Sequence, residues 1–258
     1  MAGSGNLLLD RMTPSDRAAV IAIARPVEFA LNDVFAEPER RLRNLYFVLD
    51  GLISSVVEMA DGRRVEITMA GYEGLSSPTA AFLPISAFAL EVGQIPGRAL
   101  QIDAERLRTL TAQRSELAAV IADYIVSQQQ ETAQSVGCAA LHRAEQRLAK
   151  WLLRCHDRAR RADLPLTQEY LAAMVGSQRT TINEVMGRLA AQGAIRHARG
   201  LVTILDRAAL ERVACECYRR LTEPAADAPA DHRILVGSGL DTGHDRHDAP
   251  RPARLSRP

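Results

Sequence analysis

The sequence has no apolar run long enough to cross a membrane, since none approaches the roughly 18 residues that a transmembrane helix needs. The apolar patch Leu7–Leu9 is short and has no basic segment before it, unlike a signal peptide. Cysteines are few, and the four present are not spaced like a disulfide framework or a zinc ribbon. These absences predict a cytoplasmic protein with reduced thiols and no membrane partner.

Catalytic signatures are missing as well. The chain contains no P-loop, no Gly-x-Ser-x-Gly, no His-Glu-x-x-His and no cysteine–histidine ligand set. We therefore expect no enzymatic activity, no cofactor and no metal site.

Charge is unevenly distributed, although the formal net charge is only +1. Residues 138–220 hold 15 Lys and Arg against 8 Asp and Glu, a net charge of +7. Residues 1–137 hold 12 against 17, a net charge of −5. A basic second half beside an acidic first half is typical of a nucleic-acid-binding domain attached to a sensory domain.

The first half of the sequence contains a helical pattern followed by a strand pattern. Residues 1–25 look helical, with Thr13 as a helix N-cap before Pro14. From Val27 to about Ile102 short β-like runs follow one another, with turn signals at Asp50-Gly51, Asp61-Gly62 and Gly71. Several such strands at short spacing predict a small antiparallel barrel or sandwich.

The segment between Ala104 and Gly137 is expected to be one long helix, or a short helix followed by a long one, because its apolar residues recur at helical spacing. If exposed, its apolar stripe would form a dimer seam; the alternative is that the stripe packs against its own barrel. The stripe includes Leu117, Ile121, Tyr124 and Ile125. A further helix is expected from Ala139 to His156.

The stretch from Thr167 to Arg188 has the layout of a helix-turn-helix. Ala172 is small where two helices would cross, Gly176 stands where the chain must turn, and Ser177 is a candidate N-cap of the second helix. Four apolar residues are expected to face inward: Leu171, Val175, Ile182 and Val185. The alternative is an ordinary helical hairpin within a larger domain.

Polar residues of the second helix are of types that hydrogen-bond base edges and phosphates. After them, the runs Ala194–His197 and Leu201–Leu205 flank Ala198-Arg199-Gly200 and predict a basic hairpin, or wing, against the DNA backbone. The alternative is a solvent-exposed basic turn that does not contact DNA. The candidate DNA contacts are Thr167, Ser177, Gln178, Arg179, Thr180, Thr181, Asn183, Glu184, Arg188, Arg196, His197 and Arg199.

A barrel, a long helix and a winged helix-turn-helix, in this order, resemble the Crp/Fnr family of bacterial transcription regulators. The resemblance runs from about Val27 to Arg207. It is carried by NLYFVLDGLISSVVEMADGRRVEI, AGYEGL, SVGCAALHRAEQRLAKWLL and LPLTQEYLAAMVGSQRTTINEVMGRLAAQGAIRHARGLVTIL.

This resemblance implies an α+β fold: an antiparallel β-roll like that of cyclic-nucleotide-binding domains, a long dimerisation helix and a C-terminal winged helix-turn-helix. The implied domains are residues 1–103, 104–137 and 138–222. The composition of residues 223–258 predicts a disordered tail.

The resemblance also implies a homodimer that reads a palindromic promoter site in double-stranded DNA, with RNA polymerase as a further partner. Arg179 falls at the family's contacting arginine. Thr180 and Glu184 replace the Glu and Arg of well-known members, so a different half-site is expected. Glu184 could accept from a cytosine amino group or pair with a neighbouring arginine.

Family members that bind cyclic nucleotides hold the phosphate with a Gly-Glu pair and an arginine. Here Glu73-Gly74 is reversed, and Ile85 precedes Ser86-Ala87 where the arginine belongs. No basic residue lies between Arg64 and Arg98, so cyclic AMP is not the expected effector. Two possibilities remain: an uncharged or apolar effector that binds in the roll, or no effector at all. The degenerate pocket would comprise Glu73, Gly74, Ser86, Ala87, Tyr124 and Thr132.

The spacing of the four cysteines does not predict a metal cluster or a disulfide. The chain has no cysteine before Cys138, which excludes the N-terminal iron–sulfur cluster of oxygen-sensing members. Cys138 and His142, four apart on a helix, could share a metal or haem, but plain packing is the expected role of this pair. Cys215 and Cys217 should diverge on a terminal helix and share neither a metal nor a disulfide, although a redox-reactive thiol stays open.

One alternative class remains, a regulatory module that binds a ligand in the roll and acts on a partner protein without touching DNA. The basic wing and the polar second helix discriminate against it, because a protein-docking hairpin would not need both.

Overall fold

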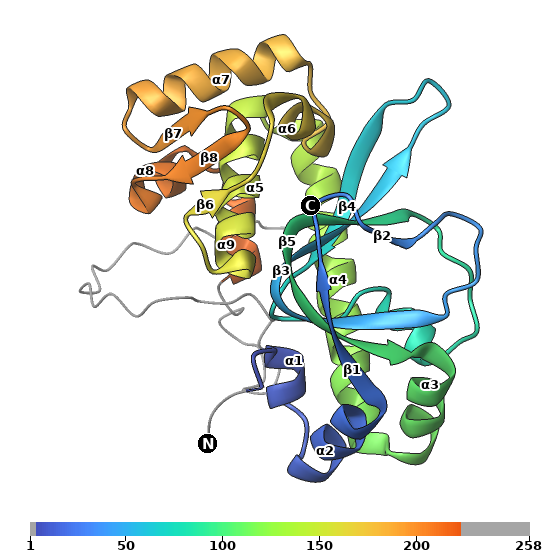
Figure 1. The fold of residues 1–258 in the computed structure, drawn as a ribbon. Helices are drawn as coiled ribbons and strands as arrows, with labels where there is room; N and C mark the ends of the chain where they lie inside the picture. The colour runs from blue at the N-terminus through green and yellow to red at the C-terminus, as the bar shows by residue number, and fades with distance from the viewer. Residues whose placement is uncertain (1–3, 223–258) are drawn as a thin grey trace, which may run out of the picture.

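The computed structural model describes residues 4–222, so the tail expected over residues 223–258 lies outside the described residues. The N-terminal half is built from helices α1 (Leu7–Asp10) and α2 (Pro14–Ile23) and a five-stranded antiparallel sheet (Figure 1). Its strands are β1 (Ala24–Phe29), β2 (Val34–Ala36), β3 (Asn44–Glu58), β4 (Arg64–Ala70) and β5 (Leu90–Asp103), with the 3-10 turn η1 (Pro78–Ala81) before β5.

Two long, bent strands, β3 and β5, run through the middle of this roll, in the order β1-β5-β3-β4 with β2 also on β5. Asp61-Gly62 makes the expected turn between β3 and β4. Asp50-Gly51 does not, which corrects the sequence interpretation. It lies within β3, where the register against β5 shifts, and Gly51 has a φ of 81°. A Cβ there would lie 2.5 Å from the Ile95 carbonyl oxygen, so the position requires glycine. The register shift marks a β-bulge within β3 in place of the expected turn.

The N-terminal helical segment is interrupted rather than continuous. Thr13 caps α2 as expected, since its side chain accepts from the Asp16 N–H and Pro14 follows at the first helical position. Ahead of it, the Asn6 side chain donates to the carbonyl oxygens of Val48 (2.7 Å) and Gly74 (2.8 Å). These bonds hold α1 against the roll.

After the roll come a short and a long helix, α3 (Ala104–Gln113) and α4 (Ser115–Leu141), separated at Arg114. The second of the two expected arrangements is therefore confirmed, although α4 continues to Leu141, beyond the expected end at Gly137. It runs along the roll and joins the two halves (Figure 1).

The stripe of large apolar residues on α4 packs against the roll. Leu117, Ile121 and Tyr124 are buried in the roll's core, and Ile125 is half-buried against it. The expectation that these four side chains form an exposed dimer seam is wrong, and the alternative of packing within the chain is correct. They are large apolar side chains, and burying them in the roll's core removes their apolar surface from water.

The C-terminal half contains α5 (Ala144–Ala159), α6 (Gln168–Met174), α7 (Arg179–Ala191), α8 (Arg207–Val213) and α9 (Cys217–Thr222). Its small antiparallel sheet has the order β6-β8-β7, from β6 (Asp163–Leu164), β7 (Ile195–Ala198) and β8 (Leu201–Ile204). Sequence reasoning missed the two-residue strand β6. Its core, centred on α5, continues into roll residues such as Leu52 and Met69, so the two halves are packed together.

The α+β fold class is confirmed: an antiparallel roll, a long helix and a winged helix-turn-helix follow one another. Across residues 4–222, no helix combines the length and apolar character needed to span a bilayer.

Candidate nucleic-acid interface

The helix-turn-helix forms between α6 and α7. Thr167 is the N-cap of α6, since its hydroxyl accepts from the Tyr170 N–H at 3.1 Å. Gly176 has a φ of 60°, and the N–H groups of Gly176 and Ser177 donate to the carbonyls of Ala173 and Ala172. The glycine is needed here because L side chains rarely adopt this conformation. Leu171, Val175, Ile182 and Val185 are all buried, as expected.

Ser177 is not the N-cap of the second helix, which corrects the sequence interpretation. α7 begins at Arg179, and the capping position belongs to Gln178, whose side chain makes no capping bond. The turn between the two helices is one residue longer than predicted from Ser177, so the capping position falls on Gln178. The first N–H groups of α7 therefore lack a side-chain acceptor, and such groups bind phosphate oxygens readily.

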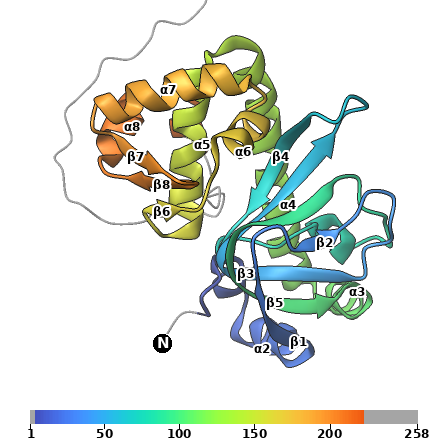
Figure 2. The ribbon, with the colours of Figure 1, turned by 45° about the horizontal axis from the view of Figure 1, so that its top comes forward.

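Helix α7 lies along the outer edge of the C-terminal half (Figure 2). Its polar side chains are exposed or half-buried. Within residues 4–222, neither Arg179 nor Glu184 has an ion-pair partner, so Glu184 is not neutralised by a neighbouring arginine. Arg188 differs, since its Nε lies 3.0 Å from Glu145 Oε1 on α5. The exposed candidates are Gln178, Arg179, Thr180, Asn183, Glu184 and Arg188; Ser177 and Thr181 are half-buried.

The wing is a tight hairpin of β7 and β8. Ala198 pairs with Leu201, and the two residues between them, Arg199 and Gly200, have φ of 47° and 77°. Positive φ at both positions is the signature of a type I′ turn. Arg196 and Arg199 are exposed, and His197 is half-buried. A Cβ on Gly200 would lie 3.5 Å from Thr167 Cγ2, so the wing tip lies beside the start of α6.

The turn of the helix-turn-helix faces the β3–β4 hairpin of the roll. A Cβ at Gly176 would lie 3.6 Å from Val65 Cγ2. A groove of about 760 Å³ separates the two elements, and its walls include Arg63 and Arg64 on one side and Ser177 and Gln178 on the other. The hairpin is therefore a direct neighbour of the N-terminal end of α7.

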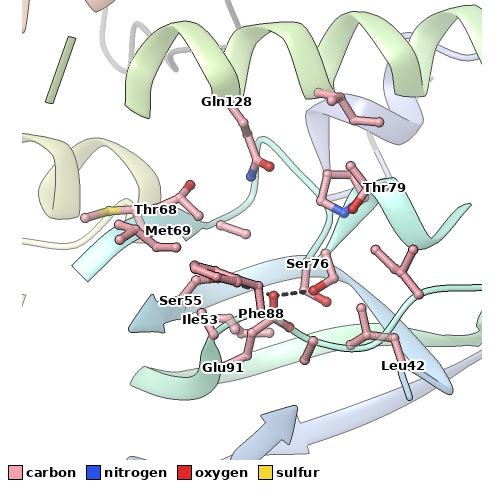
Figure 3. A pocket seen from close by; sticks show the side chains of 18 of the residues that line it. Leu42, Ile53, Ser55, Thr68, Met69, Ser76, Thr79, Phe88, Glu91 and Gln128 are labelled. Carbon is pink, nitrogen blue, oxygen red and sulfur yellow. Dashed lines mark hydrogen bonds between the residues drawn. The ribbon is translucent and has the colours of Figure 1, made fainter. Parts of the chain in front are cut away.

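A separate cavity of about 210 Å³ lies inside the roll, under α4 (Figure 3). Ser86 and Ala87 line it, as expected. Among the described lining residues Glu91 is the one ionisable group, and none is Lys or Arg. Gln128 reaches toward it from α4, and the rest of the wall is apolar or hydroxyl-bearing.

Four of the expected pocket residues lie elsewhere. Glu73, Gly74, Tyr124 and Thr132 do not line this cavity. A Cβ on Gly74 would overlap the Tyr124 hydroxyl, so the glycine serves packing against α4. Thr132 donates back to the Gln128 carbonyl at 2.9 Å within its own helix.

Glu73 instead belongs to a buried ion-pair cluster that joins the two halves. Its carboxylate lies 2.8 Å from Arg158 Nε, on α5. Glu131, on α4, pairs with both Arg158 (2.6 Å) and Arg154. Burial lowers the pKa of Arg154 to about 10, against the opposing effect of nearby carboxylates. Sequence reasoning missed this cluster because Glu73, in the loop after β4, is far in sequence from its partners on α4 and α5.

Glu91 is the polar anchor of the cavity. It accepts from Ser77 (2.7 Å) and Ser55 (3.3 Å). Burial raises the pKa of its carboxyl, and these hydrogen bonds lower it only in part. The folded chain therefore keeps this proton to higher pH than the unfolded chain, and the stability from this group is lost as pH rises through the raised pKa.

Glu91→Gln should accordingly raise Tm by a few degrees at pH 8, with a smaller gain near pH 5. Thermal unfolding followed by circular dichroism across this range measures the effect. Glu37→Gln is the control, because that carboxylate is 65% exposed. A glutamine variant that is less stable than the parent chain at pH 8 would show that the buried carboxylate is not destabilising.

Three cysteines and a histidine meet near the end of α4. The ligand atoms of Cys138, His142, Cys215 and Cys217 all lie within 4.8 Å of one another. This corrects the expectation that Cys215 and Cys217 diverge on a helix. Cys217 is the first residue of α9, and Cys215 lies in the turn before it, where both side chains can point the same way. None of the four residues belongs to α7 or lines the roll cavity.

Comparison with known proteins agrees with these features. Residues 146–213 match the model of the Crp-like helix-turn-helix domain. The chain is 29% identical over 207 residues to a CRP-like cAMP-activated global transcriptional regulator of Mycobacterium tuberculosis, and the match covers 77% of this chain and 92% of the relative.

Solved structures share the fold. A CRP-family transcriptional regulator of Thermus thermophilus matches with a TM-score of 0.62 at 21% identity, covering 73% of this chain and 96% of that one. The c-di-GMP responsive global regulator CLP of Xanthomonas campestris matches with a TM-score of 0.61 at 17% identity, covering 74% and 99%. The matched domain and the curated relative, together with the roll, the long helix and the winged helix-turn-helix, support a Crp/Fnr family transcription regulator.

Proposed function

We propose that the chain is a homodimeric regulator that binds a palindromic DNA site through paired copies of α7 and does not depend on cyclic AMP. Residues 1–103 would be the sensory domain, 104–137 the dimerisation helix and 138–222 the DNA-binding domain, with RNA polymerase as a further partner. The observation that carries DNA recognition is the solvent-facing polar surface of α7, where Arg179 lacks any ion-pair partner among residues 4–222. The twelve contacts inferred from sequence belong to this proposal.

The outer face of α4 supports dimerisation. Small apolar residues recur there at spacings of three, four and seven, which is the repeat of a coiled-coil seam. All six are exposed in the single chain, and Val136 is 67% exposed. They are Ala119, Ala122, Val126, Ala133, Val136 and Ala140. The seam proposed here replaces the buried stripe on the opposite face, and its small side chains would let two helices approach closely.

Selection of bound sequences from a random duplex pool tests this function. The full-length chain should enrich a two-fold symmetric site whose half-sites are about one helical turn apart, roughly 10 base pairs. Val136→Glu, which places a charge in the proposed seam, should abolish this symmetry and yield a monomer in sedimentation analysis. Enrichment of no sequence, or of a lone half-site by the unaltered chain, would contradict the proposal.

Independence from cyclic AMP rests on the roll cavity. The curated relative is named as cAMP-activated, yet the cavity in this chain has no Lys or Arg among its described lining residues and contains the Glu91 carboxylate. Ile85 also lines it, where cyclic-nucleotide-binding members carry arginine. A buried phosphate beside a carboxylate and without a cation would be destabilised by several kcal/mol.

Titration calorimetry with cyclic AMP is therefore expected to detect no binding at micromolar concentration, whereas the Mycobacterium tuberculosis relative serves as positive control. Micromolar binding by this chain would overturn the assignment. An uncharged ligand that fits about 210 Å³, or no ligand, agrees with the cavity better.

A further inference from the structure

We propose that Cys138, His142, Cys215 and Cys217 bind one zinc-like divalent ion in a four-coordinate site. This site would be separate from the proposed DNA-contacting surface and from the roll cavity. Neither DNA binding nor ligand binding in the roll would depend on it directly.

The spacing of the ligand atoms fits a single tetrahedral ion. Cys138 Sγ and Cys215 Sγ are 3.5 Å apart, and Cys217 Sγ and His142 Nδ1 are also 3.5 Å apart. With Zn–S bonds of about 2.3 Å and Zn–N bonds of about 2.0 Å, tetrahedral ligand atoms lie about 3.5–3.8 Å from one another. All four atoms are within 4.8 Å, so small side-chain movements would close the set.

The site is also built to exclude water. The three thiols are buried, with Cys138 and Cys217 each 1% exposed and Cys215 3% exposed. They form a cluster of their own, apart from the three apolar cores. Thiolates and imidazole are the ligands that zinc prefers, and a Cys₃His set is a common structural zinc site.

Groups around the four ligands support this coordination. His142 directs Nδ1 toward Cys217, and its other nitrogen, Nε2, lies 3.2 Å from Glu216 Oε1. A carboxylate on the outer nitrogen of a metal-bound histidine fixes its orientation and makes it more basic. Gln134 Nε2 donates to Cys217 Sγ at 3.0 Å, which would stabilise a thiolate.

Charge balance is favourable too. Three thiolates and a neutral imidazole around a divalent ion leave one negative charge, and the three protons that the thiols release pass to solvent. Lys150, which is 5% exposed, lines the same small cavity as Cys138 and can offset that charge.

Other occupants fit less well. A disulfide needs sulfurs about 2.05 Å apart, and it would use only two of the four side chains. A cluster of several irons needs ligands spread around a larger core than these atoms enclose. The single ion explains why one histidine and three cysteines converge.

The ion would join two segments that are far apart in sequence. Cys138 and His142 are in the last turn of α4 and at its end, whereas Cys215 and Cys217 flank the start of α9. The bend between α4 and α5 lies next to this cluster. Zinc would thus fix the C-terminal end of the DNA half to the long helix.

Zinc content of the full-length chain tests the site. After reconstitution with zinc chloride and removal of unbound metal, mass spectrometry of the metal should find about one zinc per chain. Cobalt(II) substitution should give the visible absorption bands of tetrahedral thiolate coordination. Cys138→Ser and Cys217→Ser should each lose both signals. Cys155→Ala, which removes a buried cysteine outside the cluster, should keep them.

Glu216→Gln guards against a loss caused by misfolding, because it leaves all four ligands in place. Its zinc affinity should fall by about 10-fold with the circular dichroism spectrum unchanged. The proposal is overturned if the unaltered chain binds no zinc or if the two serine variants retain it. Iron and sulfide bound at these four side chains in an anaerobic preparation would overturn it equally.

Discussion

Replacing Arg158 with methionine is expected to lower the free energy of unfolding by about 3–5 kcal/mol. Arg158 is 4% exposed and pairs with Glu73 at 2.8 Å and with Glu131 at 2.6 Å. Methionine can fill part of the space but leaves two buried carboxylates with less compensation. Glu73, which is fully buried, would lose its one ion-pair partner among residues 4–222.

Denaturant unfolding followed by circular dichroism measures this loss. Arg160→Met is the control, because Arg160 lies on the surface and stacks over the Tyr72 ring at 4.8 Å, so a change of about 1 kcal/mol or less is expected. Adding Glu73→Gln to the Arg158 variant should restore part of the stability, since it removes the orphaned charge. A loss below about 1 kcal/mol for Arg158→Met would show that the cluster does not join the halves.

The cluster also lies beside the close approach of Gly71 to α5. Gly71 lies where a Cβ would be 2.6 Å from Arg158 Cβ, so the loop that cradles phosphate in nucleotide-binding members here receives α5.

Arg179→Ala is expected to weaken binding to the selected site by about 10- to 100-fold, corresponding to roughly 1–3 kcal/mol. Arg179 is the first residue of α7, is exposed, and forms no ion pair within the described chain, so its guanidinium is available to DNA. Fluorescence anisotropy with a labelled duplex gives the affinities.

Arg98→Ala is the matched control for Arg179. Arg98 is exposed on the roll and pairs with Asp50 at 2.7 Å, away from the helix-turn-helix. Its loss should leave DNA affinity within about twofold, as expected for a charge outside the contacts. Unchanged affinity in Arg179→Ala would remove this arginine from the interface.

The parts predictable from sequence are those encoded locally. The spacing of Leu171, Gly176 and Ile182 fixes two helices and a turn within a short stretch, so the helix-turn-helix and its buried face are confirmed. The wing is also local, since Arg199 and Gly200 alone decide its turn. At Ser177 the prediction is wrong by one residue, because helix ends depend on backbone geometry more than on residue type.

The parts that sequence could not predict depend on distant contacts. Helical spacing shows that α4 has an apolar stripe, but not that the roll covers Tyr124 while the smaller residues remain exposed. From sequence, Glu73 is assigned to the ligand pocket, whereas in the structure it forms an ion pair with Arg158. Cys138 and Cys215, 77 positions apart, likewise carry no sign of their proximity.

The salt dependence of duplex binding tests the central claim most directly. If paired copies of α7 and the wing contact DNA phosphates, log K should fall linearly with log salt, with a loss of roughly a thousandfold or more between 50 and 200 mM salt. A flat dependence, or no binding to any duplex at low salt, would contradict DNA recognition by this chain.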